Sequence, residues 1–489
     1  MTPTFLVRAS PHRREEHEYA LSVLLGEWLG ATYSLQVEDG LAETRLRPAG
    51  TQDGPVIVMP DILLARSTAW LAPTSLPGPI QSVVIPPSWL TIDEPLPLLY
   101  ANPGLGGALV RRDGDRVVLG WDLLGSLVFM LGRYEEACEH APVDEHGRFP
   151  SSASVLASCG LLATPILDMY LHAFGALLAA VWPSLPVAPA GYEGIAIGHD
   201  VDHPSSSMRW RGRERIRTLA GDLVRRHDAG LALHRAASFV SPTRGLPRSD
   251  PYNTFDFLMR ASEEAGVHST FFFFAREADT AGRAIPHGSS YRLSDPWAEQ
   301  LLSEIARRGH HVGLHGSYDS YVDAGRLRAQ WQTLQAACDD LPEGVLRPTV
   351  RQHYLRWRPG ATWRAQARAG LRVDETLAFA DTIGYRAGTA RRFPAFDVIE
   401  HRRLPLTVVP LLVMDSALER HAAATGQDPR GAVLDLARRT HRFGGTLSLL
   451  WHNSFLQELG ARRAYAELLA ALTSPGQERG QPARKSAGW

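Results

Sequence analysis

The feature that most constrains the fold is an alternation of short apolar runs and longer helical segments, which begins near residue 191. Apolar runs of strand length occur at 195–198, 269–274, 311–315, 349–353, 406–414 and 446–451. Segments with the apolar spacing of helices occur between them at 254–265, 297–308, 324–340, 362–369 and 430–441. Strands that are separated by helices pair in parallel, so the pattern predicts an α/β fold. The number of such units favours a (β/α) barrel.

Polar side chains stand at the carboxyl ends of these predicted strands. The residues in such positions are Asp200, His315, Arg351, Asp415 and His452. Barrel enzymes build their active sites at this end of the strands. The pattern therefore predicts that these side chains gather at one rim of the barrel and form a functional site.

Two aspartates in the stretch GHDVDH (198–203) give the first indication of the chemistry. Residues i and i+2 of a strand point to the same face, so Asp200 and Asp202 are expected to lie side by side. Neighbouring carboxylates repel each other unless a cation lies beside them. A metal ion that is held by one carboxylate, with the other free to accept a proton, accounts for the pair. A surface turn rich in Asp and His is the alternative.

Residues 1–190 are expected to form a separate region. Helices are predicted at 17–29, 121–133 and 161–181, and strands at 55–59 and 82–85, which is typical of a mixed α/β domain. The polar segment 144–150 is interpreted as a turn, with a site as the alternative. The segment 188–191 marks the boundary to a barrel at 191–475, and residues 476–489 have the composition of a disordered tail.

Charge and cysteine content exclude several classes of protein. The 51 basic and 52 acidic residues nearly cancel, which gives no support to nucleic acid or an anionic membrane surface as the main partner. The 3 cysteines lack CxxC spacing, so neither a disulfide framework nor a thiolate zinc site is expected. We find no pattern of a signal peptide and no apolar run that could span a bilayer, so the expected compartment is the cytoplasm.

Four sequence motifs carry a resemblance to a known family. They are DVD at 200–202, GHHVGLH at 309–315, RQHY at 351–354 and GTLSLLWHN at 445–453. In this order they resemble the first, second, third and fifth motifs of the NodB-type polysaccharide deacetylases, the family-four carbohydrate esterases. The resemblance covers residues 191–475 and implies a distorted (β/α) barrel of NodB type. Residues 1–190 are similar to an uncharacterised region that precedes this esterase domain in some bacterial proteins, and this similarity implies no chemistry.

The resemblance implies that Asp202 and His315 bind a metal ion, but the third ligand departs from the family pattern. The family usually has a second histidine at the position of Asp319, whose oxygen is also a suitable ligand. His353 is the alternative third ligand. His311 is excluded because it would lie roughly 13 Å from His315 along an extended strand. One divalent ion is expected, with zinc favoured and cobalt, nickel or manganese as alternatives.

The resemblance also implies the catalytic roles. Asp200 would be the base that takes a proton from water, and Arg351 would pair with it and hold it ionised. His452 would be the acid that protonates the departing amine. A buried acid histidine needs an orienting carboxylate, for which Asp415 and Asp374 are both candidates.

Substrate contacts are expected from four residues. Leu450 and Trp451 would form an apolar floor for the acetyl methyl group. Tyr354 occupies the aromatic position of the third motif. Arg386 lies in a glycine-bounded segment, 384–388, that is interpreted as a rim loop.

These observations predict a metal-dependent deacetylase that acts on an acetylated sugar of a polysaccharide or its precursor, with no nucleic acid partner and no membrane span. A different class stays open, in which an inactive barrel serves as a glycan-binding or scaffold protein, and Asp319 is the residue that prompts it. A hydrolase of a non-sugar amide is a third interpretation.

Overall fold

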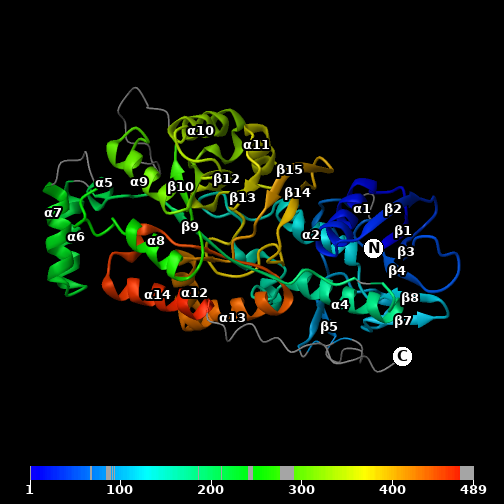
Figure 1. Ribbon diagram of the computed structural model, residues 1–489. Coiled ribbons are helices and arrows are strands. Elements are labelled where there is room, and N and C mark those ends of the chain that lie inside the picture. The colour runs from blue at the N-terminus through cyan, green and yellow to red at the C-terminus, as the bar shows by residue number, and fades with distance from the viewer. Residues whose placement is uncertain are drawn as a thin grey trace.

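The computed structural model describes residues 2–65, 69–83, 90, 92, 94–185, 187–210, 212–240, 246–275 and 291–473. Figure 1 shows an amino-terminal half and a carboxyl-terminal half, each built on its own sheet. The predicted tail at 476–489 lies outside the described residues, as do residues 84 and 85 of one predicted strand.

The carboxyl-terminal half contains a curled sheet. Its strands are β9 (Tyr192–Asp200), β10 (Thr270–Phe274), β11 (His311–Gly316), β12 (Leu346–Gln352), β13 (Val373–Asp374), β14 (Phe393–Asp397), β15 (Arg402–Val408), β16 (Val413–Met414) and β17 (Gly445–Leu450). Their order is β14-β15-β13-β12-β11-β10-β9-β17-β16, and neighbours are parallel except β14 and β15. The α/β prediction is confirmed.

A closed barrel is not formed, because among the described residues β14 and β16 are unpaired edges of this sheet. The predicted strand at 406–414 is wrong as a single element. Its first part belongs to β15 near one edge, and its last residues form β16 at the opposite edge. Pro410 lies between them and has no N–H group to continue a ladder. The segment between β15 and β16 makes single main-chain hydrogen bonds, from Val409 to Asp374, from Leu411 to Leu377 and from Leu412 to Ser448, but it is not part of either strand.

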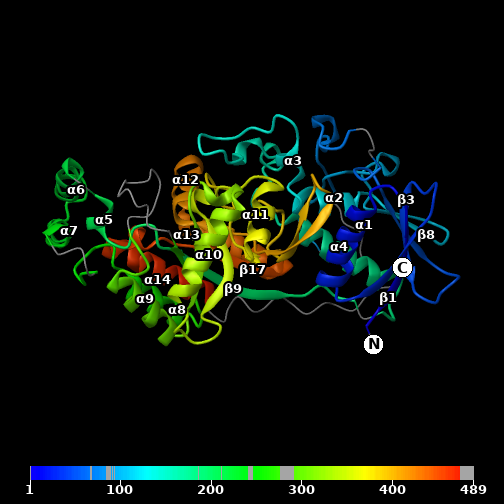
Figure 2. The same ribbon diagram turned by 90° about the horizontal axis from the view of Figure 1, so that it is seen from above.

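Helices lie between these strands, and each helix predicted after residue 191 is present. The helices of this half are α5 (Ser206–Arg209), α6 (Arg213–Val224), α7 (Ala229–Val240), α8 (Phe255–Glu264), α9 (Pro296–Arg307), α10 (Ala324–Ala337), α11 (Ala361–Ala369), α12 (Asp415–Thr425), α13 (Pro429–Phe443) and α14 (Leu459–Thr473). In Figures 1 and 2, α6 and α7 project from the end that is farthest from the amino-terminal half. None of the helices in the described ranges has the length and apolar character required to cross a membrane.

The amino-terminal half has a sheet in the order β2-β1-β3-β4-β8-β7 and a separate ribbon of β5 and β6. The strands are β1 (Thr4–Ala9), β2 (Thr32–Val37), β3 (Glu43–Pro48), β4 (Val56–Pro60), β5 (Gln81–Val83), β6 (Leu96–Leu98), β7 (Val110–Asp113) and β8 (Arg116–Leu119). The helices are α1 (Arg14–Leu21), which continues as a π-helix (Ser22–Trp28), α2 (Leu123–Leu131), α3 (Tyr134–Ala137) and α4 (Ile166–Val181). The predicted mixture of helices and strands is present.

One apolar cluster joins the two halves. It contains side chains of α1, α2 and α4 together with β14 and β15 of the curled sheet. The ring of Tyr19 stacks on Phe396 at 4.4 Å, and the Tyr19 hydroxyl donates to the Pro394 carbonyl. Figure 1 shows β14 and β15 next to α2. Because burial of shared apolar surface opposes separation, the halves are held together as one body.

A buried ion-pair network crosses the same boundary. Arg386 donates to both carboxylate oxygens of Glu136, at 2.9 and 2.5 Å, and Arg133 donates to Glu136 at 2.8 Å. The side chains of Arg386 and Glu136 are each 2% exposed. The prediction that Arg386 contacts substrate is therefore wrong, because its guanidinium is directed into the boundary between the halves.

Replacing Arg386 with alanine should lower the free energy of unfolding by about 3–5 kcal/mol, because Glu136 would stay buried with only part of its charge compensation. Urea unfolding of the full chain measures this change. The double variant Arg386→Met, Glu136→Gln is the control and should recover much of the loss. Equal destabilisation by the single and double variants would contradict the charge argument.

Candidate metal centre and active site

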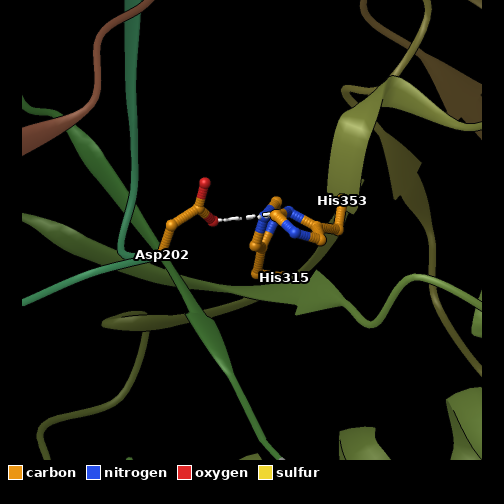
Figure 3. A group of neighbouring side chains, drawn as sticks. All are labelled: Asp202, His315 and His353. Atoms are coloured by element: carbon orange, nitrogen blue, oxygen red, sulfur yellow. Dashed lines mark hydrogen bonds and ion pairs between the residues drawn. The ribbon is translucent and has the colours of Figure 1, made fainter. Parts of the chain in front are cut away.

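Three side chains converge at the carboxyl end of the curled sheet (Figure 3). Asp202 follows β9, His315 lies in β11, and His353 follows β12. Asp202 Oδ1 is 3.0 Å from His315 Nε2 and 3.4 Å from His353 Nδ1, and the two ring nitrogens are 3.1 Å apart. Ligand atoms about 2.1 Å from a tetrahedral ion are roughly 3.4 Å from one another. The spacing of these three atoms therefore suits one small cation.

The hydrogen bonds of His315 fix its tautomer. Its Nδ1 donates to the main-chain carbonyl of Arg351 at 2.9 Å, so the proton of the neutral ring is on Nδ1. The lone pair of Nε2 then faces Asp202 Oδ1, which is buried and has no hydrogen-bond partner in the described part of the chain. Because both atoms are acceptors, a cation that both could bind accounts for their close approach.

The protonation states of the group also suit a cation. Burial lowers the pKa of His353 to about 3, so this ring is neutral at neutral pH. Phe274 packs over both imidazoles, with ring centroids 4.4 Å from His315 and 5.0 Å from His353. A neutral imidazole is the form of histidine that binds a divalent ion.

Asp319 does not join this group, which corrects the expectation that it supplies the third ligand. It lies in the loop after β11, its side chain is 65% exposed, and its carboxylate pairs with Arg356 at 3.2 Å. His353, the alternative, lies beside His315 instead. The candidate ligand set is therefore one carboxylate and two imidazoles.

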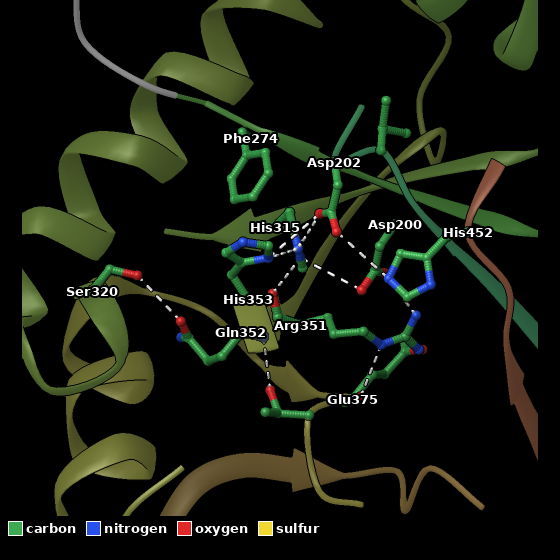
Figure 4. Close-up of polar contacts among 12 residues, drawn as sticks. Asp200, Asp202, Phe274, His315, Ser320, Arg351, Gln352, His353, Glu375 and His452 are labelled. Atoms are coloured by element: carbon green, nitrogen blue, oxygen red, sulfur yellow. Dashed lines mark hydrogen bonds and ion pairs between the residues drawn. The ribbon is translucent and has the colours of Figure 1, made fainter. Parts of the chain in front are cut away.

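A buried ion pair between Arg351 and Asp200 lies next to the three-residue group (Figure 4). Arg351 Nη1 donates to Asp200 Oδ1 at 3.1 Å, and its Nε and Nη2 donate to the carbonyl and carboxylate of Glu375 at 3.0 and 3.2 Å. Its guanidinium also lies over the Phe272 ring at 4.2 Å. A Cβ atom at Gly198 would lie 2.3 Å from Arg351 Nη1, so a larger residue there would displace the guanidinium. These contacts hold the carboxylate of Asp200 in one orientation.

His452 lies on the other side of Asp202, directly after Trp451 at the end of β17. Its Nδ1 bonds both oxygens of Asp415, at 2.9 and 3.0 Å, and its Nε2 is 3.6 Å from Asp202 Oδ2. Burial would lower the pKa of His452, but Asp415, followed by Asp202 and Asp200, raises it to about 10. The ring is therefore protonated at neutral pH, with its Nε2–H directed into the site.

Of the two residues predicted to form the acetyl floor, Leu450 packs in the core and Trp451 is partly buried against it. Leu450 has no exposed surface. The ring of Trp451 lies 5.0 Å from Tyr465 of α14, and its main-chain carbonyl accepts a hydrogen bond from His199 Nδ1. The prediction that Leu450 contacts the acetyl group is therefore wrong, while that for Trp451 stays a prediction. Tyr354 is different, since it is 36% exposed and its ring is 4.6 Å from that of His353.

Glu375 is a site residue that the sequence analysis missed. It follows β13 and binds Arg351, whereas Asp374, which was a candidate partner of His452, accepts hydrogen bonds from Trp363 and Gln366. The signal that could have found Glu375 is its place at the carboxyl end of a strand. That strand has two residues and was not predicted.

Comparisons with known proteins add the following findings. Residues 6–183 match the model of a family of unknown function, DUF7033. No curated protein matches this sequence. Among solved structures, the chain is similar to one described as a "putative polysaccharide deacetylase from Mycobacterium smegmatis", with 19% identity and a TM-score of 0.35, over 60% of this chain and 89% of that chain.

Proposed function

We propose that residues 191–475 form a metal-dependent hydrolase that removes an N-acetyl group from a sugar of a polysaccharide or its precursor, and that residues 1–190 form a second domain. The observation that carries the proposal is the convergence of Asp202, His315 and His353. Two ion pairs flank this group: Arg351 binds the carboxylate of Asp200, and Asp415 binds the ring of His452. Hydrolysis of an amide needs a base for the water and an acid for the departing amine. The two flanking groups are suited to these two tasks.

Asp202, His315 and His353 would hold the cation. Two imidazoles and one carboxylate are a ligand set that zinc adopts in hydrolases, with a further position left open, while cobalt, nickel and manganese are alternatives. When bound, such an ion polarises an acyl oxygen and lowers the pKa of a water molecule.

Asp200 would accept the proton of the attacking water. Its pairing with Arg351 stabilises the ionised form and orients the carboxylate, while the oxygen that Arg351 does not bind is left to take the proton. Asp200 ends β9 and Arg351 lies at the carboxyl end of β12, two strands that β10 and β11 separate in the curled sheet. Open α/β sheets build their active sites at these carboxyl ends.

His452 would donate a proton to the departing nitrogen from Nε2. Asp415 binds the opposite ring nitrogen, so the imidazolium is stabilised and cannot rotate away from the site. An amine is a poor leaving group unless it is protonated, so this donation is essential to cleavage of the amide.

An acetylated sugar is the substrate class that the motif resemblance favours. Release of acetate and free amine from oligomers of N-acetylglucosamine, measured before and after removal of metal with a chelator, tests the proposal. We expect release that stops on chelation and returns with a divalent ion. A metal-loaded protein that leaves acetylated sugars intact but opens small cyclic amides would contradict it in favour of a non-sugar amide substrate.

A further inference from the structure

A segment of the amino-terminal half lies at the rim of the candidate active site. The segment is 144–150, which the sequence analysis interpreted as a turn. The His146 ring is 4.6 Å from the Tyr354 ring, and His146 Nδ1 is 3.0 Å from the Tyr318 hydroxyl. Tyr354 in turn lies 4.6 Å from His353, one of the three candidate ligands. We call His146, Tyr318 and Tyr354 the rim cluster.

Two reciprocal hydrogen bonds connect this segment to the curled sheet. Arg148 Nη1 donates to the carbonyl of Tyr354 at 3.0 Å, and Arg356 Nε donates to the carbonyl of His146 at 2.8 Å. Tyr354 and Leu355 both have positive φ, 62° and 54°, a conformation that is unfavourable for an L-residue. The amino-terminal segment therefore helps to hold a strained turn that places Tyr354 beside the site.

Arg356 also contacts the rim cluster, through Tyr318. Its guanidinium lies 4.0 Å from the ring of Tyr318 and 4.1 Å from that of Tyr321, and it donates to the Tyr318 carbonyl at 2.7 Å. The three rings of the rim cluster are thus fixed by contacts from both halves of the chain.

The two arginines that contact the rim cluster are paired with carboxylates, and Glu145, whose side chain is 86% exposed, lies 3.6 Å from His146 Nε2. Arg148 pairs with Asp144 at 2.7 Å, and Arg356 pairs with Asp319 at 3.2 Å. An anionic ligand would have to displace these carboxylates. A neutral saccharide fits better, because the C–H face of a sugar ring packs on an aromatic face while its hydroxyl groups bond at the edges. Tyr354, which is 36% exposed, offers an aromatic side chain at this surface.

We propose that the amino-terminal half completes the substrate site, with His146 and Tyr354 binding a sugar unit next to the one that carries the reacting acetamide. This rests on the proposed function, since it assigns the neighbouring unit of the same substrate. Residues 6–183 would then contribute to recognition of the substrate by the full chain.

The test compares the binding of a monomer and a tetramer of N-acetylglucosamine to the full chain by calorimetry. Wild type should bind the tetramer at least tenfold more tightly than the monomer. His146→Ala should lose about tenfold in tetramer affinity, with monomer affinity, metal content and Tm unchanged. His146→Phe keeps the ring but not the hydrogen bond to Tyr318, and it should retain tetramer affinity within about threefold.

Val143→Ala is the matched control, because Val143 lies near the same segment and is 63% exposed. It should behave as wild type. Unchanged tetramer affinity in His146→Ala would overturn the inference, and so would an equal loss in His146→Ala and His146→Phe, which would indicate a structural hydrogen bond. Acetate release in the same samples reports separately on the proposed function.

Discussion

Replacing Asp200 with asparagine should lower kcat by about 10²–10⁴-fold, the range typical of removal of a general base. Asparagine has nearly the same shape and can still face Arg351, but it cannot accept the proton of water. Because Asp200 is not among the three candidate ligands, the variant should keep its metal. Initial rates of acetate release, together with metal content, measure both effects.

Asp319→Asn is the control for this substitution. It makes the same chemical change at an exposed aspartate that pairs with Arg356, and kcat should stay within about twofold of wild type. Retention of full activity by Asp200→Asn would show that Asp200 is not the base.

Replacing Asp415 with asparagine should shift the alkaline limb of the pH–rate profile to lower pH. His452 must be protonated to act as the acid, so activity is lost as pH rises through its pKa. Asp415 is the main group that raises this pKa against the effect of burial. A bound cation would offset the effect of Asp202 and Asp200 on the pKa of His452. The alkaline limb of the metal-loaded wild type should therefore lie below pH 10.

The profile of kcat against pH measures the shift. His452→Ala supplies the comparison, since it should lower kcat by about 10²–10⁴-fold and abolish the alkaline limb. If Asp415→Asn moved the acid limb instead, or left both limbs in place, then Asp415 would not act through the protonation of His452.

Much of the candidate site could be predicted from the sequence because strand periodicity is local. An apolar run followed by a polar residue indicates a strand end, and parallel strands bring such ends to one edge. Asp200, His315, Arg351 and His452 lie together for this reason, and the Arg351–Asp200 and His452–Asp415 contacts are both present.

The third ligand could not be chosen from the sequence because the decision depends on backbone turns. Tyr354 and Leu355 adopt positive φ directly after His353, and the His353 ring lies against that of His315. Asp319 lies four residues after His315, as the family histidine would, but Arg356 holds it at the surface. Neither the turn nor this ion pair has a signature in local sequence.

The sequence pattern predicted the wrong role for Arg386 and left that of segment 144–150 undecided between a turn and a site, for a related reason. Both depend on contacts between residues that are far apart in the chain, such as Arg386 with Glu136 and His146 with Tyr318. A glycine-bounded arginine and a polar turn have the same appearance in a sequence whether they face solvent, substrate or another part of the protein.

The most direct test of the metal centre is the metal content of purified wild type, His353→Ala, His315→Ala, Asp202→Ala and Asp319→Ala, each supplied with divalent ions and then dialysed. We expect about one ion per chain in wild type and in Asp319→Ala, and nearly none in the other three variants, because their side chains form the ligand set. A folded wild type that binds no ion, or a His353→Ala variant that keeps its ion while Asp319→Ala loses it, would contradict this account.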